Sequence, residues 1–202
     1  TVFSFVLLVA SVGIIAIGRD YYKSLTSVKL QETTRSVVDD ISSSLQFSQT
    51  DAISSHLYDG GVPATVKVRC FGSDRYRYII NQKVQKVTDP THPDRFHALY
   101  RDKRPSESSC DASGNWTDGT ELLGDNMRLL QFEVSNSDPF QVTIRVAYGD
   151  NDLLTNYPDD ATPSTPPNSS PPFAQVNCKY AYAGNQFCAV AGLETTVTSR
   201  VE

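Results

Sequence analysis

The stretch TVFSFVLLVASVGIIAIGRDYYKSL (residues 1–25) decides the fold, because its first seventeen residues contain no charged side chain. A helix over those residues would be about 26 Å long, slightly less than the roughly 30 Å hydrocarbon core of a bilayer. We therefore expect further apolar residues upstream of Thr1. A cleaved signal peptide has a similar apolar core, but small residues mark its cleavage site, whereas Gly18-Arg19-Asp20 leads into more helix-compatible sequence.

The sequence from Tyr21 to about Ser55 continues this helix with one-sided apolar spacing. It has no proline or glycine, and its apolar residues recur at steps of three and four: Leu25, Val28, Val37, Val38, Ile41 and Leu45. The pattern predicts one continuous helix that is apolar on all sides in its first third and amphipathic afterwards. The amphipathic part can pack on the rest of the chain, whereas the first third needs a bilayer or copies of itself.

After Gly60-Gly61-Val62-Pro63 the apolar period changes from helix-like to strand-like. The predicted strands are 64–71, 75–82, 97–101, 127–135, 140–148 and 193–201. One long helix followed by sequential strands predicts an α+β fold, in which one face of an antiparallel sheet lies on the helix. Residues 1–57 then form a helical arm and residues 58–202 a β-rich globular head. Residues 88–110 and 156–172 are rich in loop-forming residues, and we expect both segments to be exposed insertions.

Composition limits the class of protein. The 202 residues are 39% hydrophobic, which is enough for one substantial core. The net charge of −5 gives no overall attraction to nucleic acid or to anionic lipid, although local patches stay possible.

The four cysteines indicate disulfides. Three pairings are open, and we favour Cys70–Cys110 with Cys178–Cys188, because the last two bracket the short loop CKYAYAGNQFC. The alternative is a zinc site, but there is no CxxC, and no histidine stands near the cysteines at finger-like spacing. Disulfides imply an oxidising compartment.

No catalytic constellation is visible, so we expect neither an enzyme nor a cofactor. There is no G-x-S-x-G and no glycine-rich phosphate loop. Asp150, Asp152, Asp159 and Asp160, together with Asp111, Asn115 and Asp118, offer oxygen atoms of the kind that calcium prefers. Their order does not match an EF-hand, and we predict no metal site.

Two basic runs with interleaved tyrosines could bind a DNA strand or another ligand. The first run contains Lys67, Arg69, Arg75 and Arg77. The second contains our candidate contact residues, which are Arg95, Arg101, Lys103 and Arg104. Strands that face water often show the same alternation, so a solvated sheet face is the alternative explanation.

The chain resembles type IV pilins and pseudopilins, particularly the larger minor pilins. The likeness lies in the arm TVFSFVLLVASVGIIAI, its continuation RDYYKSLTSVKLQETTRSVVDDISSSLQ, the strand-rich head and the disulfide-spaced cysteines. The architecture covers nearly the whole chain, and the diagnostic pattern covers its N-terminal third. The Phe-Thr-x-x-Glu start of mature pilins is absent, and Thr1-Val2-Phe3-Ser4-Phe5 resembles sequence further inside a pilin helix.

The resemblance implies a structural subunit of an extracellular filament that serves adhesion, motility or DNA uptake. Before assembly the subunit would sit in the cytoplasmic membrane, and its partners would be copies of itself or related pilins and the assembly machinery. The residues that the resemblance places in the filament core are Val2, Phe3, Phe5, Val6, Leu7, Val9, Ala10, Val12, Gly13, Ile14 and Ile17. The alternative function is a single-pass, membrane-anchored extracellular binding module that does not polymerise.

Overall fold

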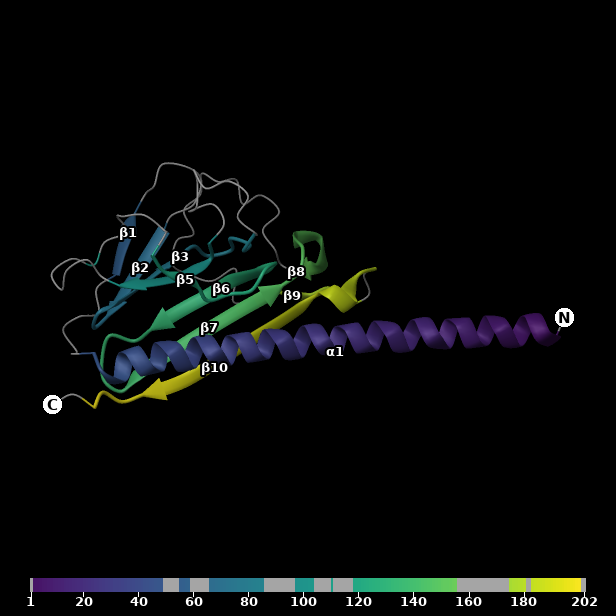
Figure 1. Cartoon of the computed structure of the whole chain (residues 1–202), viewed down its shortest axis with the longest axis horizontal. Coiled ribbons are helices and arrows are strands. Elements are labelled where there is room, and N and C mark those ends of the chain that lie inside the picture. The colour runs from purple at the N-terminus through teal and green to yellow at the C-terminus, as the bar shows by residue number, and fades with distance from the viewer. Residues whose placement is uncertain are drawn as a thin grey trace.

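The computed structural model describes residues 2–48, 55–58, 66–85, 97–103, 110, 118–155, 175–180 and 183–200. A single long helix, α1 (Val2–Gln46), precedes the strands, and Figure 1 shows it running alongside the strands and far beyond them toward the N-terminus. The strands are β1 (Ser55–Tyr58), β2 (Val66–Phe71), β3 (Asp74–Tyr78), β4 (Leu99–Lys103), β5 (Thr120–Glu121), β6 (Met127–Val134), β7 (Phe140–Tyr148), β8 (Leu154–Thr155), β9 (Asn177–Cys178) and β10 (Ala189–Val197). Two short 3-10 turns, η3 (Asn151–Leu153) and η5 (Asn185–Phe187), complete the described elements. The predicted α+β class is confirmed.

The described strands form three antiparallel sheets, whereas we expected one sheet. One has the order β1-β2-β3-β4-β5, the second the order β10-β7-β6, and the third pairs β8 with β9. Helix α1 packs mainly on β10 and β7 of the second sheet. The two larger sheets meet beside β6, where Asn81 N donates to Leu129 O at 2.7 Å and Val84 N donates to Met127 O at 2.8 Å. We call the strands and their connections the head.

The helix ends at Gln46, so the prediction that it extends to about Ser55 was wrong. Ser48 is fully buried, and both its amide and its hydroxyl donate to the carbonyl of Leu45, at 3.2 and 3.0 Å. These bonds close the last turn of the helix without a glycine or a proline. Residues Ser55–Tyr58 then pair with β2 as an edge strand.

Strand β10 lies four residues earlier than the predicted strand 193–201. It pairs with β7 from Ala189↔Tyr148 to Val197↔Phe140. Three of the first four residues of β10 are alanine or glycine, which have low strand propensity, so pairing with the neighbouring strand favours this extension more than local sequence does. The predicted strand 75–82 ends at Tyr78, and residues 64–65 and 201 of the predicted strands lie outside the described residues.

The predicted strand 97–101 is found as β4, two residues later, so that part of the segment 88–110 is a central strand and not an exposed insertion. Ala98, Leu99 and Tyr100 are at most 2% exposed, because β4 lies between β3 and β5. Most of the other predicted insertion, 156–172, lies outside the described residues.

The largest core cluster joins α1 to both of the larger sheets. The helix contributes Leu30, Val37, Val38, Ile41 and Leu45, each at most 3% exposed. Leu25 and Val28 share the apolar spacing, but they are 48% and 49% exposed. The apolar contact between helix and head therefore begins at Leu30, and the prediction that the whole spaced series packs on the head was wrong for its first two members.

Two valines of α1 offer a matched test of this boundary. Val38→Ala is expected to lower the free energy of unfolding by about 2 kcal/mol, because it removes buried methyl groups and leaves a cavity. Val28→Ala is expected to change it by less than about 0.5 kcal/mol. Denaturant unfolding in mild detergent, followed by the near-ultraviolet circular dichroism of the buried tyrosines, measures both. Equal losses in the two variants would contradict the boundary.

Candidate functional site

The outstanding surface of this molecule is the apolar segment, residues 2–17 of α1. Every large apolar side chain in it is more than half exposed, from Leu7 at 51% to Val2 at 78%. In Figure 1 this part of the helix projects away from the head. All the candidate filament-core residues lie on it, and they face every direction around the helix axis.

Helix α1 is, within the part of the chain that the structure describes, the helix long and apolar enough to cross a membrane. None of its most apolar 18-residue window is buried. Ser11 lies in this segment, and its hydroxyl donates to Leu7 O at 2.8 Å, so the helix itself satisfies that polar group. These properties suit membrane insertion or a signal sequence.

Two glycines leave open space along this helix. A Cβ built on Gly13 or on Gly18 would meet no neighbouring atom within 4 Å outside the helix's own backbone. Small residues on an apolar helix let another helix approach closely. A larger side chain at either position therefore fits within the monomer. It would disturb a contact only where another molecule packs against the helix.

The second half of α1 is also tied to the five-stranded sheet by polar contacts. Arg101 of β4 forms ion pairs with Asp40 of α1 and, at 3.2 Å, with Asp74 of β3. Ser44 Oγ donates to Asp74 Oδ2 at 3.0 Å, and Tyr76 OH donates to Asp40 Oδ2 at 3.1 Å. The helix is thus held by the apolar core that it shares with both larger sheets and, on the five-stranded sheet, by charged contacts as well.

We call the contact of Asp40 and Ser44 with Asp74, Tyr76 and Arg101 the joint, and its electrostatics favour charged carboxylates. Burial alone would raise the pKa of Asp74, but the hydrogen bond from Lys103 and the charge of Arg101 bring that pKa below its ordinary value. Burial is the main cause that raises the pKa of the Tyr76 phenol, which therefore stays a neutral hydrogen-bond donor. Asp74 thus accepts as a carboxylate while Tyr76 donates to Asp40 as a neutral phenol.

Two of the four candidate DNA-contact residues belong to this joint. Arg101 pairs with Asp40 and Asp74, and Lys103 Nζ lies 2.7 Å from Asp74 Oδ1. Their charges are balanced by carboxylates from distant parts of the sequence, which local spacing could not reveal. Arg95 and Arg104 lie outside the described residues, and the DNA contact stays a prediction.

Two of the four residues of the first basic run are interior and do not lie on a water-facing sheet surface. Arg77 is fully buried, and Arg75 is 4% exposed. Both bind Asp102 of β4: Arg75 Nε donates to Oδ1 at 2.8 Å, and Arg77 Nη2 donates to Oδ2 at 2.5 Å. The Arg77 guanidinium also lies 5.3 Å from the centre of the Tyr100 ring. Burial is the main cause that lowers the pKa of Arg77.

Both disulfides have the pairing that the spacing favours. Cys70 is bonded to Cys110 and Cys178 to Cys188, with Cα–Cα distances of 6.0 and 5.8 Å. Among the described residues, no group of three His, Cys, Asp or Glu side chains could hold a metal ion. Of the calcium candidates, Asp150 pairs with Lys83 Nζ at 2.6 Å, and Asp111, Asn115, Asp159 and Asp160 lie outside the described residues.

The Cys178–Cys188 bond closes a loop that lies against α1 just beyond the apolar segment. We call its described residues, 178–180 and 183–188, the disulfide loop. Thr26 Oγ1 donates to Gln186 O at 3.4 Å, and the rings of Tyr22 and Phe187 are centred 6.1 Å apart. These contacts hold the loop beside a part of the helix that the sheets do not reach.

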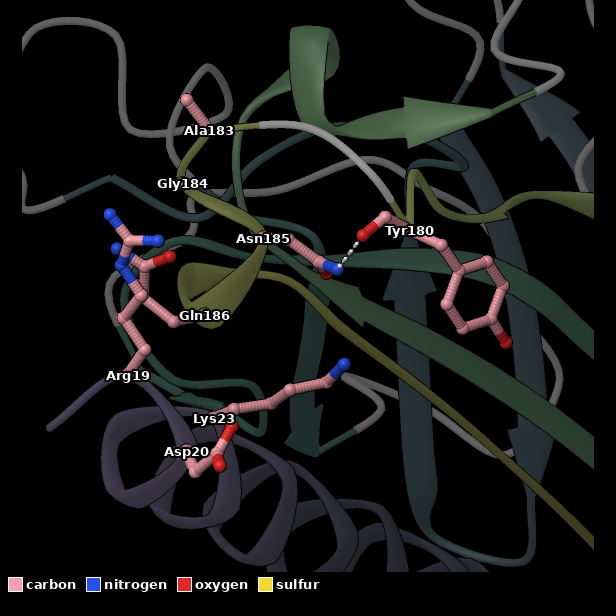
Figure 2. Close-up of a pocket in the computed structure, with 8 residues that line it drawn as sticks. All are labelled: Arg19, Asp20, Lys23, Tyr180, Ala183, Gly184, Asn185 and Gln186. Atoms are coloured by element: carbon pink, nitrogen blue, oxygen red, sulfur yellow. Dashed lines mark hydrogen bonds between the residues drawn. The ribbon is translucent and has the colours of Figure 1, made fainter. Parts of the chain in front are cut away.

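A pocket of about 550 Å³ lies between this loop and the helix. Figure 2 shows the residues that line it, which are Arg19, Asp20 and Lys23 of α1 and Tyr180, Ala183, Gly184, Asn185 and Gln186 of the loop. No pattern in the sequence predicted this pocket. The one available signal was the pair Arg19 and Lys23, which stand four residues apart directly after the apolar segment.

Arg75, Arg77 and Asp102 form a buried triad, and removing the carboxylate charge of Asp102 should strongly destabilise the fold. Asp102→Asn keeps the shape of the side chain but leaves two buried guanidinium groups without their carboxylate, so we expect a loss of about 3–5 kcal/mol in the free energy of unfolding. Asp150→Asn removes the carboxylate of a pair whose aspartate side chain is 70% exposed, and it should cost less than about 1 kcal/mol. Denaturant unfolding with the disulfides intact measures the free energy of unfolding of both variants. Similar decreases in the two variants would refute a structural role for the triad.

The Asp74 joint predicts a pH dependence. A carboxyl group whose pKa is lower in the folded chain stabilises the fold fully above its unfolded pKa, and this stabilisation is lost as the pH falls through the folded pKa. The ordinary value is 3.8, so the free energy of unfolding should fall as the pH goes from about 5 to 2. Asp74→Asn should show a shallower fall over the same range. Parallel curves for the two proteins would exclude this contribution.

No family model, no curated protein and no solved structure matches the chain. What the described residues establish is a long N-terminal apolar helix packed on antiparallel sheets, with two disulfides in the head. These features fit a membrane-associated or secreted protein.

Proposed function

We propose that this chain is a structural subunit of a type IV pilus-like extracellular filament, inserted in the membrane through α1 before assembly. The observation that carries the proposal is the contrast within one helix. Residues 30–45 are fixed to the head, whereas the large apolar side chains of residues 2–17 are more than half exposed on all sides. The head cannot cover that surface, so another apolar environment has to.

A bilayer and a bundle of identical helices both provide such an environment. Moving α1 from lipid into a bundle keeps its side chains among apolar neighbours, so assembly exposes no apolar segment to water. A contact between different surfaces of identical subunits, repeated along an axis, gives an open filament rather than a closed ring. Gly13 and Gly18 supply places where neighbouring helices approach closely.

The rigid attachment of helix to head supports the same function. The apolar contact at residues 30–45 and the Asp40–Arg101 pair prevent the head from turning freely about α1. Packing of the helices then sets the position of every head on the outside of the filament. The head serves as a non-enzymatic surface, without a cofactor, for adhesion, motility or DNA uptake, and its disulfides suit an extracellular location.

Electron microscopy of filaments sheared from cells that produce the full-length protein tests this function. Mass spectrometry of the same material identifies the subunit and its N-terminus. Filaments that contain this chain support the proposal. Recovery of the chain in the membrane fraction alone, with none in the sheared material, would instead favour the anchored binding module.

Substitutions on the apolar segment separate the two functions. Val9→Arg places a charge near the middle of the segment, at a cost of about 2.5–3.5 kcal/mol for insertion. We expect it to abolish filaments, whereas Val9→Leu should leave them at wild-type levels. Under the binding-module alternative, Val9→Arg would only weaken anchoring.

Gly13→Leu distinguishes helix packing from insertion. It keeps the segment apolar and meets open space in the monomer, so membrane insertion and head stability should not change. Filament yield should fall at least tenfold if a neighbouring helix packs against this position. Filaments at wild-type yield in both Val9→Arg and Gly13→Leu would overturn the proposed role of the segment.

A further inference from the structure

We infer that the pocket between α1 and the disulfide loop binds the phosphate headgroup of an anionic phospholipid. The inference rests on the membrane insertion that the proposed function includes, but it does not require polymerisation. Four features of the pocket carry it: its charge, its rigidity, its position along the helix and the apolar side chains that adjoin it.

The charge of the pocket suits an anion. Arg19 and Lys23 stand four residues apart, so they share one face of α1, and Asp20 is the one carboxylate among the lining residues. In Figure 2 the Arg19 side chain extends toward the loop, and the Lys23 side chain extends toward Tyr180. Arginine and lysine bind phosphate through charge-assisted hydrogen bonds, and the lining amides of Asn185 and Gln186 add further polar groups.

The loop wall of the pocket is held in place before any ligand binds. The Cys178–Cys188 bond closes the loop, and Asn185 Nδ2 donates to Tyr180 O across it at 2.8 Å (Figure 2). Gly184 has a φ of +94°, a conformation that favours glycine, and a Cβ there would lie 3.3 Å from Leu153. A preformed wall lowers the entropic cost of binding.

The position along the helix matches a membrane surface. Arg19 follows Ile17 by two residues, about 3 Å along the axis, so insertion of the apolar segment brings the pocket to the level of the headgroups. Aromatic side chains surround this level: Tyr21, Tyr22, Tyr180 and Phe187 are between 48% and 86% exposed. Tyrosine is enriched where proteins meet the membrane interface.

The neighbouring apolar residues favour a lipid over free phosphate. Ile15 lies one turn before Arg19 on the same helix face, and Val12 lies one further turn back; they are 55% and 59% exposed. A phospholipid whose phosphate meets Arg19 and Lys23 can lay its acyl chains along Val12 and Ile15. Inorganic phosphate would gain nothing from that apolar strip.

The test is native mass spectrometry of the full-length chain in non-ionic detergent, with added phosphatidylglycerol or phosphatidylcholine. The pocket variant Arg19→Gln/Lys23→Gln is compared with the control Lys29→Gln/Arg35→Gln, which removes the same charge from exposed residues of α1 outside the pocket. We expect wild type and control to retain phosphatidylglycerol equally, and the pocket variant at least tenfold less. Phosphatidylcholine should be retained weakly and equally by all three.

Three results would overturn the inference. Equal retention of the two lipids by wild type would remove the preference for an anionic headgroup, and equal loss in both double variants would show attraction to overall charge. Displacement of the lipid by millimolar inorganic phosphate would make the pocket a phosphate site without a lipid. Unchanged near-ultraviolet circular dichroism verifies that the variants fold. Because the measurement uses the dispersed chain, failure to form filaments leaves its result unchanged, and failure to bind lipid leaves the filament test unchanged.

Discussion

The packing of residues 30–45 of α1 against β7 and β10 is the contact on which the rest of the structure depends. Five apolar side chains of the helix are buried there, each contributing about 1.5–3 kcal/mol relative to exposure. This contact fixes one half of a continuous helix, and the rigidity of the helix then determines where the other half points. The apolar segment is exposed because the described head does not extend along it. Its exposure does not reflect a polar sequence, because the segment is no less apolar than the buried half of the helix. The exposed apolar segment and the helix face that closes the core thus belong to one continuous element.

Charge has an internal role in this head. The alternation of basic and aromatic residues over β3 and β4 resembles a solvated sheet face. In the structure, however, Arg75 and Arg77 both pair with Asp102. Arg101 pairs with Asp40 of the helix and with Asp74. Buried guanidinium groups cost free energy unless they are paired, so each pair requires its partners at defined positions. The charged contacts therefore specify how α1 and the five-stranded sheet fit together, while the apolar contacts supply most of the stability.

Features that depend on local pattern could be predicted from the sequence. The apolar segment, the strand β7 from Phe140 to Tyr148 and the disulfide pairing follow from composition, period and spacing. Features that depend on distant partners could not. The end of α1 depends on Ser48 in a buried turn, the first residues of β10 depend on β7, and the pocket requires the disulfide loop to meet Arg19 and Lys23 across some 160 residues of sequence. Nothing near Arg101 in the sequence indicates that its partners are Asp40 and Asp74.

The stretch of α1 between Ile17 and Leu30 separates the apolar segment from the main core. Its thirteen steps correspond to about 20 Å along the axis, and within the described part of the head the disulfide loop is the segment that contacts the helix there. If the apolar segment is inserted with α1 perpendicular to the membrane, this stretch separates the sheets from the lipid headgroups. Among the described residues of the head, the disulfide loop then lies nearest to the membrane surface.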